Sequence, residues 1–246
     1  MKRNIAIKVT NLGKKYKIGG REAYLTLRDM LTGLIGSNRL NKSFWALKEV
    51  SFEVRKGEML GVIGANGAGK STLLKLLSQI TELSSGEMLI RGRIRSLLEL
   101  GVGFNSELTG KENIFLNGVI LGMKRKEVRG KLKQIVGLAG IEKFMDTPTK
   151  YFSSGMFIRM GISVLFYTDF DILIIDEILA AVDKRFQDKV FVFLEDQKRQ
   201  GKTIILVSHN LELVRKHCQK VILLEKGRIK KFGEANKVID CYLTKI

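Results

Sequence analysis

Short apolar runs rich in β-branched residues recur along the chain, and longer stretches separate them. A short apolar run bounded by polar residues is typical of a buried strand, whereas the longer stretches favour helices. The pattern predicts strands at 5–9, 45–54, 59–64, 87–92, 171–176, 203–208 and 220–225. It predicts helices at 70–79, 124–136, 157–167, 187–199 and 210–217. Strands that alternate with helices indicate an α/β domain with a largely parallel sheet.

One long stretch interrupts this alternation. Residues 108–159 contain little strand signal, so we expect a helical subdomain inserted in the α/β core. The sequence contains no internal repeat and no low-complexity tract. Only the short tail 234–246 follows the last strand-like pair, which is too little chain for a second domain. We therefore expect a single domain over residues 1–246.

Composition limits the class of protein and the kind of partner. With 246 residues, 45% of them hydrophobic, the chain can form a packed globular core. Its longest stretches without a charged residue, 59–69 and 113–123, are shorter than the about 20 residues that a membrane-spanning helix needs. The 43 Lys and Arg against 25 Asp and Glu give a net charge of +18. This excess fits an anionic partner: a nucleotide, a nucleic acid or an acidic membrane surface.

The N-terminus and the two cysteines indicate a cytosolic protein. The first residues are basic but do not continue into the apolar core of a signal peptide. Cys218 and Cys241 lie in no CxxC pair and cannot form a disulfide framework, so we expect reduced thiols. His209, His217 and Cys218 lack the paired spacing of zinc ligands.

A glycine-rich loop between a predicted strand and a predicted helix carries the strongest signal. The sequence GANGAGKST satisfies the phosphate-loop pattern GxxxxGK[ST] in the strand–loop–helix context that the pattern requires. Its glycines let main-chain N–H groups close around phosphate oxygens, and the following helix presents its positive end to the same anion. We expect Lys70 to reach the β- and γ-phosphates and Ser71 to bind Mg²⁺. The nucleotide-binding residues predicted here are Gly64, Ala65, Asn66, Gly67, Ala68, Gly69, Lys70, Ser71 and Thr72.

An acidic pair ends the apolar strand predicted at 171–176. Asp176 and Glu177 follow four apolar residues, which places both carboxylates at the carboxyl edge of the sheet. We expect Asp176 to hold Mg²⁺ and Glu177 to act as the general base that orients the attacking water.

The segment Phe152-Ser153-Ser154-Gly155-Met156 precedes an apolar helix, so its hydroxyl and N–H groups lie at a helix N-terminus that suits an anion. Here the chain resembles the ABC-transporter ATPase family, whose signature is usually LSGGQ. Ser154 stands in place of the first Gly and Met156 in place of the Gln. The resemblance implies an α/β P-loop NTPase of the ABC ATPase type, with a mixed sheet core and an inserted helical subdomain. It also implies ATP and Mg²⁺ as cofactors, and a homodimer in which Ser153, Ser154 and Gly155 of one copy clamp the γ-phosphate held by the other.

The same resemblance assigns further residues. His209 ends the predicted strand 203–208, where the family has its switch histidine, and Asp183 occupies the position of the aspartate in the family's D-loop. Tyr16 stands where an aromatic residue commonly stacks on adenine, although about 25 extra residues separate it from the next strand. Phe44 and Trp45 are competing candidates, and any of the three could belong to the core. We expect His217 to be an ordinary surface residue.

Several departures from the common motifs point to one branch of the family. Where other members have a glutamine that links Mg²⁺ to the membrane partner, the nearest polar residue is Glu99. The chain also reads SSGM in the signature and DEILAAVD after the acidic strand. These features resemble the exporter ATPases that handle lipid-linked O-antigen, teichoic acid or capsular polysaccharide. Some of these continue into a carbohydrate-binding domain, which the tail 234–246 is too short to form.

The resemblance implies an ATPase bound peripherally to the cytoplasmic face of the bacterial inner membrane. Its partners would be two copies of a separate permease subunit, with no nucleic acid. Two alternatives stay open: an ABC ATPase for a drug, lipid or nutrient, and a soluble ABC ATPase that acts on nucleic acid or ribosomes. The basic runs 124–133 and 226–246 could approach an anionic leaflet, but a solvated helix face and a solvated tail are the favoured interpretation.

Overall fold

The structure, a computed structural model, describes residues 4–18 and 42–244. Six strands form the central sheet in the order β5-β6-β7-β3-β8-β9. All neighbours in this sheet are parallel except β8 and β9, which pair as an antiparallel hairpin at one edge. The sheet is therefore mixed, as predicted. Its strands are β3 (Met59–Ile63), β5 (Ile94–Ser96), β6 (Ile172–Ile175), β7 (Thr203–Val207), β8 (Lys220–Glu225) and β9 (Arg228–Glu234).

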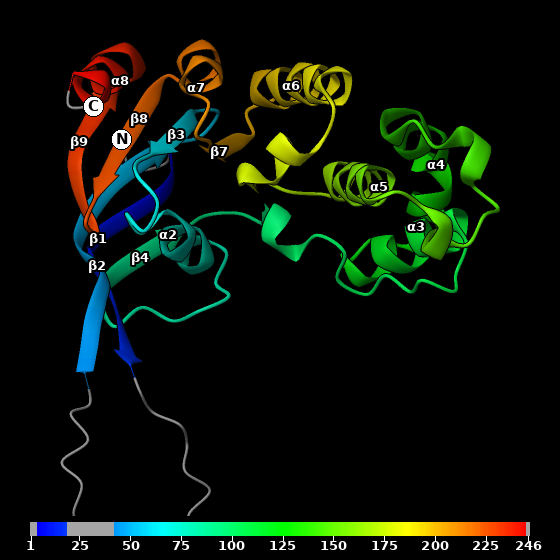
Figure 1. Ribbon diagram of the computed structural model, residues 1–246, viewed down its shortest axis with the longest axis horizontal. Coiled ribbons are helices and arrows are strands. Elements are labelled where there is room, and N and C mark those ends of the chain that lie inside the picture. Colours follow the sequence, from blue (N-terminus) through cyan, green and yellow to red (C-terminus); the bar gives the residue numbers. More distant parts are fainter. Residues whose placement is uncertain (1–3, 19–41, 245–246) are drawn as a thin grey trace, which may run out of the picture.

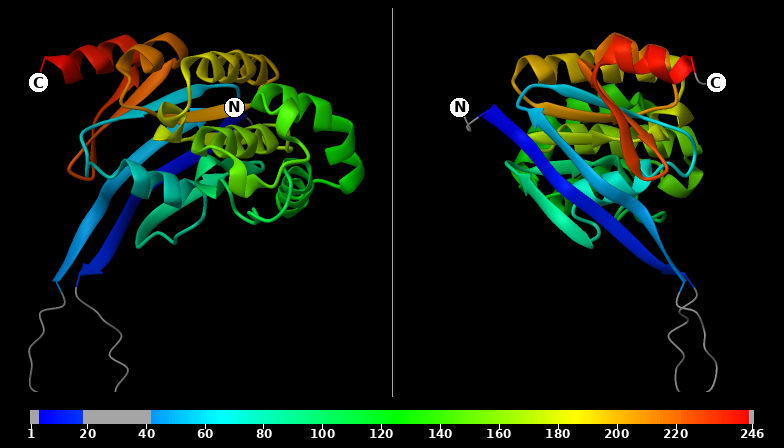
Figure 2. Two further views of the ribbon diagram at one scale, coloured as in Figure 1. Left: turned by 45° about the vertical axis from the view of Figure 1, so that its right-hand side comes forward. Right: turned by 90° about the vertical axis from the view of Figure 1, so that its left-hand side faces the viewer.

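A second, antiparallel sheet packs against the first and extends beyond it (Figure 2). It has the order β2-β1-β4 and consists of β1 (Ile5–Ile18), β2 (Lys42–Arg55) and β4 (Ser85–Ile90). Helix α2 (Lys70–Leu77) shares one apolar core with this sheet and with one face of the central sheet. The buried side chains of this core include Leu73, Leu74, Leu76 and Leu77 of α2. The first turn of α2 is thereby held beside the end of β3.

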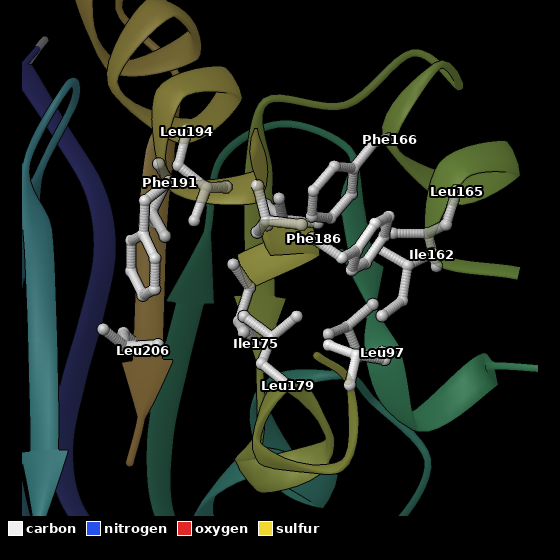
Figure 3. Close-up of a cluster of buried hydrophobic side chains, with 14 of the residues drawn as sticks. Leu97, Ile162, Leu165, Phe166, Ile175, Leu179, Phe186, Phe191, Leu194 and Leu206 are labelled. Atoms are coloured by element: carbon white, nitrogen blue, oxygen red, sulfur yellow. The ribbon is translucent and has the colours of Figure 1, made fainter. Parts of the chain in front are cut away.

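Helices cover the other face of the central sheet (Figure 1). They are α5 (Ser154–Phe166), α6 (Lys184–Arg199), α7 (Leu211–His217) and α8 (Ala235–Leu243). Strand β6 is apolar without alternation because both of its faces are buried. Ile172 and Ile174 enter the core on the α2 side, whereas Leu173 and Ile175 enter the core under the helices. Figure 3 shows Ile175 packed among residues of α5 and α6 in this second core.

Residues 108–159 contain the helices α3 (Gly110–Ile120) and α4 (Arg125–Ala139) and the short 3₁₀ turns η3 (Glu142–Phe144) and η4 (Thr149–Tyr151), and they run into α5. A capping box between Thr109 and Glu112 begins α3. The buried Asn113 amide donates to the carbonyl groups of Asn105 and Leu108, both at 2.9 Å. It thereby supplies hydrogen bonds to main-chain carbonyl groups of the loop that leads into the helix. None of the helices in the described part of the chain is both long enough and apolar enough to cross a membrane.

Two expectations about the C-terminal part were wrong. The basic run 226–246 is not a solvated tail, because 228–234 form β9 and 235–243 form α8, whose Ala235, Val238 and Ile239 are buried at helical spacing. His217 is not a surface residue: it is 9% exposed, stacks on Phe191 and lies 3.1 Å from a carboxylate oxygen of Glu195. Packing of α7 against α6 buries it.

Candidate functional site

The phosphate loop joins the end of β3 to the start of α2, as the sequence predicts. Its backbone requires glycine at both ends. Gly64 has φ 148°, and a Cβ atom there would collide with the carbonyl group of Leu224. Gly69 has φ 107°, and a Cβ atom there would lie 2.8 Å from the carbonyl oxygen of Ala46. Close packing on both sides thus determines the path of the loop.

Lys70 begins α2 and is almost enclosed, with 6% of its surface exposed. Its ammonium group donates to the carbonyl groups of Gly64 (2.9 Å) and Ala65 (3.2 Å). A carboxylate oxygen of Glu177 lies 3.6 Å away. The loop therefore holds a positive charge at its centre, with hydrogen bonds that offset the cost of burying it.

Sheet order brings the acidic pair and His209 to the loop. Strand β7 lies between β6 and β3, and the three are parallel, so their carboxyl ends share one edge. Glu177 follows β6 and His209 follows β7, and Nε2 of His209 lies 2.9 Å from Oε1 of Glu177. One carboxylate thus contacts both the buried lysine and the histidine.

Asp176 lies deeper at the same edge. Its carboxylate accepts a hydrogen bond of 3.1 Å from the main chain of Ile178 and caps the 3₁₀ turn η5 (Glu177–Ala181). Burial raises the pKa of Asp176, the Ile178 hydrogen bond opposes this shift, and the charge of Glu177 adds to it. No Lys, Arg or His of the described residues forms an ion pair with Asp176. A bound cation is what such a carboxylate lacks, so Asp176 fits a Mg²⁺ site.

A cavity of about 470 Å³ opens beside the phosphate loop. Loop and helix residues line one side of it, and Phe44, Trp45 and Lys226 line the other. Phe44 and Trp45 are 47% and 40% exposed. Tyr16 lies opposite Phe44 on the neighbouring strand β1, with the two rings stacked at 5.8 Å, and does not line the cavity. Of the three aromatic candidates, the two on β2 therefore face the phosphate loop.

A second cavity, of about 540 Å³, lies on the other side of the acidic pair. Asp176, Glu177, Ser208 and His209 line its polar side, and Leu206, Leu213 and other apolar side chains line the rest. Because Glu177 borders both cavities, it stands between the phosphate loop and the histidine.

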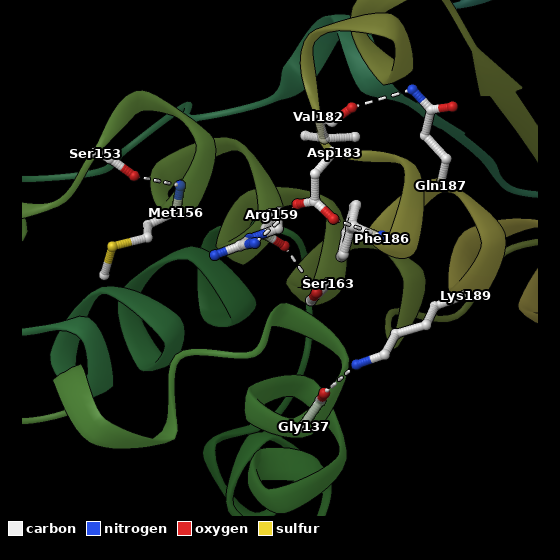
Figure 4. Close-up of polar contacts among 10 residues, drawn as sticks. All are labelled: Gly137, Ser153, Met156, Arg159, Ser163, Val182, Asp183, Phe186, Gln187 and Lys189. Carbon is white, nitrogen blue, oxygen red and sulfur yellow. Dashed lines mark hydrogen bonds and ion pairs between the residues drawn. The ribbon is translucent and has the colours of Figure 1, made fainter.

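The signature segment lies at the start of α5. The hydroxyl group of Ser153 accepts a hydrogen bond of 3.2 Å from the main chain of Met156 and so caps the helix (Figure 4). Ser153 and Ser154 are exposed, and Gly155 is partly exposed. In Figure 1, α5 and the phosphate-loop helix α2 lie in different parts of the molecule. The predicted signature residues are thus not brought to this chain's own phosphate loop.

One ion pair joins the signature helix to the segment after the acidic pair. Arg159 of α5 donates to Asp183 at 2.9 Å, and Asp183 caps α6 by accepting a hydrogen bond of 2.9 Å from the main chain of Phe186 (Figure 4). These bonds, the Phe186 one first, lower the pKa of the Asp183 carboxyl. Sequence reasoning named Asp183 but missed Arg159, because only the packing of α5 beside α6 makes them partners.

Glu99 ends the 3₁₀ turn η2 (Leu97–Glu99), which follows the edge strand β5. It is partly buried, and burial raises the pKa of its carboxyl, while the charge of Arg95 opposes the shift. It lines neither cavity at the phosphate loop and the acidic pair.

A family model described as ABC transporter matches residues 47–180, more than half of the chain. The matched region contains the phosphate loop, the signature segment and the acidic pair. The chain belongs to the ABC transporter family. It is an ATPase of this family.

Curated ABC relatives cover most of the chain. An O-antigen export system ATP-binding protein of Klebsiella pneumoniae is 44% identical over 201 residues, which are 82% of this chain and 82% of that protein. A teichoic acids export ATP-binding protein of Lactococcus lactis is 38% identical over 239 residues, which are 97% of this chain and 50% of that protein. This chain therefore spans about half the length of the second relative.

Solved ABC cassettes share the fold. An ATP-binding subunit of an ABC transporter has a TM-score of 0.75 at 24% identity, over 96% of this chain and 93% of that one. A dimeric cassette in a post-hydrolysis state, bound to ADP and Pi, has a TM-score of 0.74 at 22% identity, over 93% of this chain and 98% of that one. These likenesses confirm the predicted fold class.

Proposed function

We propose that this ABC ATPase is the ATP-binding and hydrolysing subunit of an exporter that moves a lipid-linked polysaccharide of the O-antigen kind across the cytoplasmic membrane. The observation that supports this choice of cargo is the 44% identity to an O-antigen export ATP-binding protein over 82% of both chains. The teichoic-acid relative supports the same cargo class, a polymer of the cell envelope.

In this proposal the phosphate loop and Lys70 bind the triphosphate of ATP. Main-chain N–H groups of the loop and the N-terminal end of α2 face the phosphates, and the buried ammonium group supplies a full positive charge. Ser71 and Asp176 would hold Mg²⁺, which shields the phosphate charge when it is bound. Phe44 or Trp45, rather than the more distant Tyr16, would stack on the adenine ring.

Glu177 and His209 carry the hydrolytic step in this proposal. Glu177 is held between Lys70 and His209, at 3.6 Å and 2.9 Å, so its carboxylate oxygen has a defined position at the end of the phosphate loop. A carboxylate in that position can orient a water molecule and accept its proton as the water attacks the γ-phosphate.

A second copy of the chain completes the site. Ser153, Ser154 and Gly155 present a helix N-terminus to the outside of the chain, and an anion held by another copy's phosphate loop would fit it. Asp183 lies at the end of the segment that joins the acidic pair to α6 and would approach the other copy with it. Glu99 and its surroundings would contact one of two permease subunits, which hold the ATPase at the cytoplasmic face of the membrane.

A chromosomal Lys70→Ala replacement tests the cargo. We expect completed glycan to accumulate on its lipid carrier at the cytoplasmic face, while surface glycan is lost. Lys75→Ala is the matched control, because Lys75 is an exposed lysine of the same helix. If surface glycan stays normal while uptake or efflux of a small molecule fails, the proposed polysaccharide cargo is wrong. The assignment as an ABC ATPase would still hold.

A further inference from the structure

The turn between β8 and β9 lies directly against the phosphate loop. Glu225 pairs with Arg228 across the hairpin, so Lys226 and Gly227 are the two turn residues. The main-chain N–H of Gly227 donates to the carbonyl group of Ala68 at 3.0 Å, and the carbonyl group of Gly227 accepts from Lys48 of β2 at 2.8 Å. The turn is therefore fixed relative to the phosphate loop and to the cavity of about 470 Å³ beside it.

Lys226 adopts a backbone conformation that other residues adopt more easily. Its φ is 49°, and that of Gly227 is 75°. A two-residue hairpin turn with two positive φ angles favours Asn, Asp or Gly at its first position. Such strain is characteristic of functional positions. Turn geometry thus does not explain why a lysine occupies this position.

Lys226 borders two cavities that residues of the phosphate loop also line. It lines the cavity that contains Asn66, Gly67, Lys70 and Trp45. It also lines a smaller cavity, of about 350 Å³, together with residues 65–68. Lys226 is therefore placed within reach of whatever the loop binds.

Lys226 also has a charge that the described structure leaves available. The neighbouring carboxylate of Glu225 lies 3.5 Å from Lys230, and no ion pair of the described residues includes Lys226. The other lysine of the cavity, Lys70, lies 3.6 Å from Glu177, so its charge is partly compensated. Two lysines and one glutamate give the cavity a net positive charge that suits a polyphosphate.

We propose that Lys226 is a second nucleotide-binding cation, whose ammonium group helps to hold the phosphates of the nucleotide bound at the loop. The inference rests on the proposed nucleotide site and adds to it a residue outside the phosphate-loop motif. A flexible lysine at the mouth of the cavity can follow the charge of the phosphates without the fixed geometry of Lys70. The residue contributes to binding and not to the hydrolytic step.

Calorimetric titration of the full chain with ATP, ADP and AMP tests this role. We expect Lys226→Asn to weaken ATP binding by about two- to fivefold, the usual worth of an exposed charge pair, and to weaken AMP binding less. Lys226→Arg should keep the affinity. Because Asn tolerates a positive φ better than Lys, Lys226→Asn should melt at the same or a higher temperature. Lys230→Asn, on the same hairpin but outside both cavities, is the matched control.

The possible results separate this role from the nucleotide site itself. Unchanged ATP affinity in Lys226→Asn, or equal losses for ATP and AMP, overturns the role of Lys226. Weak binding in Lys70→Ala beside normal binding in Lys226→Asn leaves the phosphate loop as the site and removes only Lys226 from it. If Lys70→Ala binds ATP like the wild type, the proposed nucleotide site fails as well.

Discussion

The phosphate-loop region and the signature region differ in where their anion-binding groups find partners. Lys70 is buried and donates to two carbonyl groups of its own loop. Ser153 and Ser154, at the start of α5, are exposed to solvent. A buried ammonium group must be hydrogen-bonded within the chain, whereas an exposed helix end can leave its N–H groups to water. One region is therefore preorganised by its own chain, and the other is open to a second chain.

The two regions are also anchored differently. Main-chain hydrogen bonds and close glycine contacts tie the phosphate loop to both β8–β9 and β2. The signature helix rests on the apolar core, and the ion pair Arg159–Asp183 ties it to the segment before α6. Mutations in the two regions should consequently impair different steps of the ATPase cycle.

The largest expected effect comes from replacing the general base next to the phosphate loop. Glu177→Gln should slow ATP hydrolysis by roughly 10²–10⁴-fold, the usual worth of a positioned acid–base group. ATP binding should change little, since the phosphate loop is intact, and the ATP-bound dimer should accumulate. Turnover assays and size-exclusion chromatography with ATP measure both effects. Near-normal turnover would remove Glu177 from the catalytic role.

Mixing two inactive variants tests whether the open region serves another copy. Lys70→Ala and Ser154→Arg should each abolish hydrolysis when assayed alone. An equimolar mixture should recover about one quarter of wild-type activity, because random pairing makes half of the dimers mixed and each mixed dimer has one intact site of two. Each variant mixed with itself is the control. No recovery after subunit exchange would indicate that the signature does not act across the dimer.

A smaller effect concerns the ion pair that joins the signature helix to the segment before α6. Arg159→Ala should reduce dimer hydrolysis several-fold while leaving ATP binding unchanged, and should cost about 0.2–1 kcal/mol of folding free energy, as exposed ion pairs do. The folded-state pKa of Asp183 is lowered, so the pair stabilises the fold above the ordinary Asp pKa and loses this contribution as the pH falls through the folded pKa. The stability difference between wild type and variant should thus be present at pH 7 and be lost as the pH falls through the lowered pKa of Asp183.

Lys184→Ala is the matched control for this experiment. Lys184 forms an exposed ion pair with Asp188 within α6, at 3.2 Å, and no ion pair of the described residues joins it to α5. Its replacement should cause a similar small stability loss without any change in turnover. Equal turnover in the Arg159 and Lys184 variants would argue against a role of the Arg159–Asp183 ion pair in ATP hydrolysis.

The smallest effect concerns the core behind the phosphate-loop strand. Cys218 is 6% exposed, and burial raises the pKa of its thiol to about 12, so almost no thiolate forms at pH 8. Iodoacetamide should therefore modify Cys241 first in the native protein and reach Cys218 only after unfolding. Mass spectrometry of native and urea-treated samples measures the order. Rapid native modification of Cys218 would show that this core opens more readily than the packing indicates.

The sequence by itself determined the parts of the site that are local in the chain. Strand, glycine-rich loop and helix follow one another between residues 59 and 77, so the phosphate loop is recognisable without knowing the rest of the fold. Glu177 was predictable for a related reason: it follows an apolar strand, and the carboxyl ends of parallel strands meet at one edge of a sheet. His209, by contrast, was predicted from the resemblance to the ABC ATPase family. The roles of these residues in ATP hydrolysis stay predictions.

Tertiary structure alone decided which residues meet across the chain. The pairing of β1 with β2 leaves Phe44 and Trp45 at the cavity beside the phosphate loop and stacks Tyr16 on Phe44, although the sequence favoured Tyr16 as the aromatic residue that stacks on adenine. Helix packing made Arg159 the partner of Asp183, and the β8–β9 turn brought Lys226 to the phosphate loop. Such pairs lie 24 or more residues apart in sequence, and their contact depends on sheet order and helix packing that no local pattern encodes.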